Sequence, residues 1–101
     1  MSDNISISAT GAAARECPKS FGQFTKLDRW FNGRPLFVNN KGQYLHVSNG
    51  GYWFVSSELN EPGICSKGAP LCPGDAKNWT YWDGSKHNPA SITIKCGTHN
   101  K

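Results

Sequence analysis

The sequence predicts an all-β protein, a small antiparallel sheet or sandwich with long loops that is stapled by two disulfides. Three observations predict this class. Short apolar runs alternate with polar residues and are separated by turn signals rich in glycine and asparagine. No segment has the length and periodicity of a helix. Four cysteines, an even number in a chain of 101 residues, are typical of a disulfide framework.

Residues 34–57 are predicted to form two hairpins. The dipeptide Asn49-Gly50 favours a two-residue hairpin turn, whose central positions both need positive φ. Residues 39–42 are expected to form a four-residue turn. These two turns place Leu45 opposite Phe54 on one side and opposite Leu36 on the other.

Successive side chains of a strand point to opposite faces of the sheet, so these turns also predict which residues share a face. The expected core face carries Leu36, Val38, Leu45, Val47, Tyr52 and Phe54. The other face carries Phe37, Tyr44, His46, Trp53 and Val55.

The second face is the candidate ligand-binding site, with Tyr44, His46 and Trp53 as its platform and His46 directly opposite Trp53. Aromatic faces suit sugar rings and partner chains. The alternative is that this face is a second buried layer, covered by the aromatic residues of 79–82 and by the N-terminal segment. The buried layer is favoured, since a small β protein must cover both faces of its sheet.

The rest of the chain is predicted from shorter patterns. Residues 17–33 are expected to be extended with a turn, and a single helical turn at 26–30 is an alternative. A long loop rich in proline and glycine covers 58–78. Short strands follow at 79–82 and at 92–95, and the segment between them contains a further loop.

We expect one domain, residues 17–98, between a flexible polar tail at 1–16 and a C-terminal tail at 99–101. The first sixteen residues do not fit a signal peptide, because Asp3 stands where basic residues belong and no apolar core follows. A vector-derived leftover and the mature end of a longer precursor are alternative origins of this segment.

The cysteines allow three connectivities, of which we expect Cys17–Cys96 and Cys65–Cys72. The first pair would clamp the ends of the domain and the second would tie down the 58–78 loop. Free buried thiols in a cytosolic protein are an alternative to the disulfides. Structural zinc is less favoured than either, because six residues separate Cys65 from Cys72 and no histidines have paired ligand spacing. We therefore expect no metal and no cofactor.

Disulfides belong to oxidising compartments, and two Asn-x-Ser/Thr triplets, at Asn4 and Asn78, agree with that environment. The predicted location is extracellular or at the cell surface, with both asparagines as glycosylation sites. The formal net charge of +4 favours anionic partners. The basic residues are scattered, which argues against nucleic acid, and no apolar run is long enough for membrane insertion.

Several motifs occur in a familiar order: NGRP at residues 32–35, then YLHV, GYWFV, WTYWDG and ITIKC. In this order they resemble a small cysteine-containing module of extracellular proteins in algae, other protists and marine invertebrates. The resemblance covers residues 17–96, and NGRP and W-x-x-W-D-G are its most specific parts. It implies an extracellular, non-enzymatic module of unknown function and indicates no site. The usual pattern has bulkier residues at the position of His46.

No catalytic residues are predicted, because the acidic residues form no spaced pair and no nucleophile motif accompanies His46. The expected function is an extracellular structural or adhesive module that binds protein surfaces or copies of itself. A small lectin-like module that binds glycans is the first alternative. The second is a secreted inhibitor or toxin that acts through the rigid loop CSKGAPLC, residues 65–72.

Overall fold

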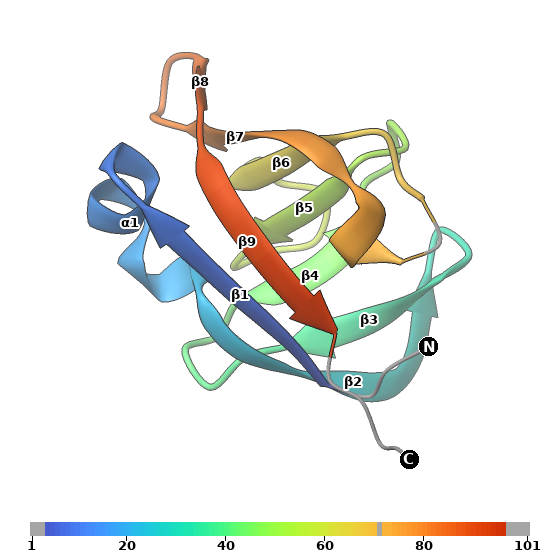
Figure 1. Ribbon diagram of the computed structural model, residues 1–101. Coiled ribbons are helices and arrows are strands. Elements are labelled where there is room, and N and C mark those ends of the chain that lie inside the picture. Colours follow the sequence, from blue (N-terminus) through green and yellow to red (C-terminus); the bar gives the residue numbers. More distant parts are fainter. Residues whose placement is uncertain (1–3, 71, 97–101) are drawn as a thin grey trace.

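A computed structural model describes residues 4–70 and 72–96, and it confirms the all-β class. In this part of the chain nine antiparallel strands form one nearly closed sheet, in the order β8-β7-β6-β5-β4-β3-β2-β1-β9 (Figure 1). The strands are β1 (Asn4–Thr10), β2 (Gly22–Phe31), β3 (Arg34–Val38), β4 (Tyr44–Val47), β5 (Trp53–Ser56), β6 (Ile64–Lys67), β7 (Lys77–Trp82), β8 (His87–Pro89) and β9 (Ser91–Cys96). The short helices are α1 (Ala12–Glu16), η1 (Pro18–Ser20) and η2 (Pro73–Asp75).

The N-terminal segment is not the flexible tail that we predicted for 1–16. Residues Asn4–Thr10 form β1, which lies between β2 and β9 and pairs with both. Ile5 and Ile7 are buried, because the alternation Ile-Ser-Ile-Ser turns both isoleucines to the core and the serines away from it. Residues 1–3 and the predicted tail at 99–101 lie outside the described residues.

The turn at Asn49-Gly50 has three residues instead of two. The Ser48 N–H donates to the Tyr52 carbonyl at 2.8 Å, so these two residues face each other. The left-handed position is Gly51, with φ of 86°. Three-residue hairpin loops commonly end on a left-handed glycine, and the third residue moves the register of β5 against β4 by one.

The turn between β3 and β4 closes in the same way. The Asn39 N–H donates to the Gln43 carbonyl at 3.0 Å, and Gly42 has a φ of 80°. The loop therefore holds residues 40–42, one fewer than the predicted four. This change shifts the register of β3 against β4 by one residue as well.

A one-residue shift moves side chains to the other face of a sheet, so the predicted faces were wrong for β3 and β5. Leu45 lies opposite Phe37 and Val55, and Val47 lies opposite Trp53. The cluster of buried apolar side chains inside the sheet consists of Ile5, Ile7, Ala13, Phe21, Phe24, Phe37, Leu45, Val47, Trp53, Val55, Ile64 and Trp79.

Two strands lie in segments that we predicted as loops. β6 (Ile64–Lys67) lies within 58–78, and β8 (His87–Pro89) lies in the loop after 79–82. Each is too short to show a clear period in the sequence, and each is defined by pairing with β7. Extended structure is confirmed in β2, where a register shift between Lys26 and Trp30 occupies the place of the alternative helical turn.

Candidate functional site

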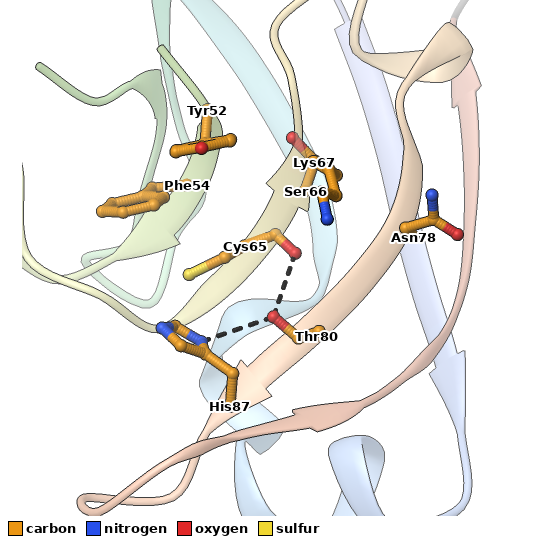
Figure 2. A pocket seen from close by; sticks show the side chains of 8 residues that line it. All are labelled: Tyr52, Phe54, Cys65, Ser66, Lys67, Asn78, Thr80 and His87. Atoms are coloured by element: carbon orange, nitrogen blue, oxygen red, sulfur yellow. Dashed lines mark hydrogen bonds between the residues drawn. The ribbon is translucent and has the colours of Figure 1, made fainter. Parts of the chain in front are cut away.

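A groove of about 350 Å³ lies on the outer face of the sheet, the face opposite the apolar core. Register places Phe54, Cys65 and Thr80 side by side on this face, across β5, β6 and β7. Its volume is in the range of small-ligand sites. We call this hollow the outer groove, and its lining residues are Tyr52, Phe54, Cys65, Ser66, Lys67, Asn78, Thr80 and His87 (Figure 2).

One wall of the outer groove is aromatic. Tyr52 and Phe54 lie next to each other at this wall (Figure 2), and the ring of Tyr52 is 41% exposed. Because the turn that precedes β5 has three residues, both rings point outward. The predicted two-residue turn would have placed them on the core face. The register shift in the hairpin therefore forms this wall.

The remaining walls are polar. Thr80 Oγ1 donates to the Cys65 carbonyl at 3.4 Å and lies 3.4 Å from His87 Nδ1. The His87 ring also contacts Trp82, with 4.8 Å between ring centroids. These contacts orient an otherwise exposed imidazole at one end of the groove (Figure 2).

Asn78 lies on the opposite side of the groove from the aromatic wall (Figure 2). It is exposed and has a left-handed φ of 57°. The irregular pairing between Cys65 and Lys67 on β6 lies beside it. The other predicted glycosylation site, Asn4, is also exposed, at the start of β1.

The buried Cys65 lies at the floor of the groove, and its Sγ lies 3.8 Å from the Gly63 carbonyl oxygen. Burial raises the pKa of this thiol above its ordinary value. Reactive cysteines have the opposite property, a lowered pKa. The groove therefore offers shape, aromatic surface and hydrogen-bonding groups, but not an activated thiol.

The predicted platform of Tyr44, His46 and Trp53 does not form, because Trp53 points to the core face. Trp53 is completely buried, and its Nε1–H donates to the Pro70 carbonyl at 2.9 Å. Trp53 lies in the same apolar cluster as Leu45 and Val47 of the predicted core face, and not in a separate second layer. Trp79, one of the predicted covering residues, lies in the same cluster.

His46 lies opposite Phe54 instead of Trp53, and it is completely buried. Its Nε2 accepts the Asn60 N–H at 2.8 Å, so its Nδ1 carries the proton and donates to the Tyr44 carbonyl at 3.2 Å. Phe31 and Phe54 contact the ring with their own rings at about 6 Å between centroids. Burial lowers the pKa of this imidazole. His46 is therefore a neutral structural residue that holds the loop after β5.

The structure brings together two cysteines that we did not predict to pair. Cys96 Sγ lies 3.1 Å from Cys72 Sγ, whereas the predicted pairs were Cys17–Cys96 and Cys65–Cys72. The segment CSKGAPLC is not a protruding loop at its start. Its first three residues belong to β6, and Cys65 and Ser66 are buried.

Within residues 4–70 and 72–96, no group of three or more histidine, cysteine, aspartate or glutamate side chains lies close enough to hold a metal ion. Within the same residues, no helix has the length and apolar character needed to cross a membrane.

Comparison with known proteins gives no match, whether with family models, curated proteins or solved structures. The geometry of the outer groove is therefore the basis for a functional proposal. The groove was not predicted from the sequence, because it depends on β6 and β8, two strands that lie in predicted loops. Among the sequence motifs, WTYWDG gave the strongest indication of the groove, since it contributes Thr80.

Proposed function

We propose that this protein is a non-enzymatic extracellular module that binds a glycan in the outer groove. The observation that carries the proposal is the exposed aromatic wall of Tyr52 and Phe54 facing polar groups across one small hollow. The C–H groups of a sugar ring pack on an aromatic face, while hydroxyl groups need donors and acceptors at the edge. Lys67 and His87 supply polar groups of this kind.

An acidic sugar fits the site better than a neutral one. Lys67 lines the groove, and no aspartate or glutamate is among its described lining residues. The formal charge of +4 adds a favourable field for an anion over the whole surface. We therefore expect sulfated or carboxylated saccharides to bind more tightly than their neutral counterparts.

The pKa of the groove's thiol and the hydrogen bonds of its hydroxyl and imidazole groups also favour a binding role over catalysis. Burial raises the pKa of Cys65, and Thr80 Oγ1 donates its proton to the Cys65 carbonyl and not to His87. A nucleophile needs a nearby base that takes its proton. The extracellular location is supported by the exposed Asn4 and Asn78 in their glycosylation triplets.

A glycan array with protein made without N-glycosylation tests the proposal. We expect retention of acidic saccharides, and at least a tenfold loss of affinity in both Tyr52→Ala and His87→Ala, because aromatic anchors dominate such sites. Trp30→Ala is the matched control, since Trp30 is a 65% exposed aromatic residue outside the groove. Absence of binding to any saccharide, or equal loss in the control, would contradict the proposal.

Trp30 itself favours a second function, the adhesive module that binds protein surfaces or copies of itself. It is the most exposed of the large apolar side chains in the described part of the chain, next to the turn between β2 and β3. Sedimentation of the wild type and of Trp30→Ala over a range of concentrations tests this function. Self-association that is lost in the variant would support it, and a monomer at every concentration would count against self-adhesion.

A further inference from the structure

The sheet has a seam where its two ends meet. β8 and β9 are the terminal strands in the hydrogen-bonded order, and β9 pairs with β1 on one edge only. Its other edge passes close to β7 and η2, with which it is in contact (Figure 1). One backbone hydrogen bond, from the Ala90 N–H to the Trp79 carbonyl at 3.0 Å, lies at the start of this seam.

Two cysteines face each other at the far end of the same seam. Cys72 immediately precedes η2, and Cys96 is the last residue of β9. Their sulfur atoms lie 3.1 Å apart, although 24 positions separate them in the sequence. We propose that Cys72 and Cys96 form a disulfide that closes the seam between β9 and the segment leading into β7.

The local backbone supports this pairing. The Asp75 N–H donates to the Cys72 carbonyl at 3.0 Å, which fixes the turn that presents the first sulfur. Gly74 lies directly beside the pair, since a Cβ atom added there would be 3.4 Å from Cys96 Sγ and 3.9 Å from Cys72 Sγ. Both cysteines are partly exposed, so an oxidant can reach them.

The oxidation is a two-electron step. Each thiol loses its proton, one S–S bond forms, and the two electrons reduce the disulfide of an oxidised dithiol oxidoreductase or of oxidised glutathione to two thiols. Burial and the hydrogen bond with Cys72 raise the pKa of Cys96 to about 11. The Cys96 thiolate is therefore scarce at neutral pH.

Tryptic mapping under non-reducing conditions distinguishes all three connectivities, because cleavage after lysine and arginine leaves each cysteine in its own peptide. The cysteine peptides are 16–19, 42–67, 68–77 and 96–101. In protein refolded with a mixture of oxidised and reduced glutathione, we expect 68–77 joined to 96–101. Linkage of 96–101 to 16–19, linkage of 68–77 to 42–67, or free thiols at both positions would overturn the proposal.

Stability gives a second, independent readout. The double variant Cys72→Ser/Cys96→Ser should melt about 10–20 °C below the oxidised wild type, and its melting temperature should fall less than that of the wild type when a reducing agent is added. The matched control, Cys17→Ser/Cys65→Ser, should retain the 68–77 to 96–101 link and its sensitivity to reduction. If the control loses that sensitivity and the first variant keeps it, the disulfide lies elsewhere. Failure of glycan binding would leave this result unaffected, because the mapping uses no ligand.

Discussion

At the scale of single residues, two of the three positions that we first considered for binding, Trp53 and His46, are parts of the interior. Trp53 points into the apolar cluster and donates a hydrogen bond from its indole to Pro70. His46 lies on the other face but is completely covered, and both of its nitrogens have backbone partners. Substitutions at these positions should therefore change stability before they change binding.

Trp53→Ala should lower the free energy of unfolding by about 3–5 kcal/mol, because it removes a buried indole and leaves a cavity. Urea denaturation followed by circular dichroism measures this change. Trp30→Ala is the control, with an expected change within about 0.5 kcal/mol at an exposed site. If Trp53→Ala kept its stability and lost only binding, Trp53 would be an exposed binding residue, and the buried position described here would be wrong.

His46 makes stability depend on pH. Its folded pKa is lowered below 6.5 by burial, so the unfolded chain binds a proton that the folded chain does not. The contribution of the neutral ring is complete above pH 6.5 and is lost as the pH falls below it, by about 1.4 kcal/mol per pH unit until the folded pKa is reached. Protonation of Nε2 also removes the acceptor for the Asn60 N–H.

We expect the free energy of unfolding of the wild type to decrease between pH 7 and pH 5 more than that of His46→Gln. Urea titrations at each pH measure the difference. His87→Gln, at an exposed histidine, should follow the wild type. Parallel pH profiles for the wild type and His46→Gln would contradict the assignment of a neutral buried imidazole.

At the scale of elements, β1 has the largest consequence for the fold. It lies between β2 and β9, so without it the chain would lose the pairing that holds its last strand. Ile5 and Ile7 provide its share of the core. The pattern Ile-Ser-Ile-Ser was visible in the sequence, but four residues of alternation predict a strand only when neighbouring strands exist to pair with it.

Ile7→Ala should reduce the free energy of unfolding by about 2–5 kcal/mol, as expected for a large side chain removed from a core. Ser8→Ala, at the exposed neighbouring position of the same strand, is the control and should have little effect. Thermal unfolding of both variants gives the comparison. If residues 1–16 were a tail, both variants would melt with the wild type.

At the scale of the whole molecule, net charge and the position of the groove act together. The +4 charge attracts acidic saccharides at long range, and Lys67 adds a cation at the groove itself. Salt screens such interactions over about 8–10 Å at 0.10–0.15 M ionic strength. Affinity for an acidic glycan and affinity for a neutral one should therefore respond differently to salt.

Raising sodium chloride from 0.05 to 0.5 M should weaken binding of an acidic glycan several-fold and leave a neutral analogue nearly unchanged. Titration calorimetry with the two ligands measures this. Lys67→Gln should reduce the salt dependence, whereas Lys41→Gln, at an exposed turn outside the groove, should preserve it. Salt-independent binding of the acidic ligand would contradict the role of charge.

The sequence by itself determined the all-β class, the two central hairpins, the extended segment before them and the alternating last strand. These features depend on local patterns and on turn residues that are neighbours in the chain. Only the tertiary structure decided which face each side chain occupies, because one residue more or less in a turn reverses every side chain of the following strand. The three-residue turn that ends on Gly51 placed Trp53 in the core and Tyr52 at the groove, and the turn that ends on Gly42 placed Phe37 in the core. The contact of Cys72 with Cys96 and the groove across β5–β8 likewise join residues far apart in the sequence, and no local pattern contains such a contact.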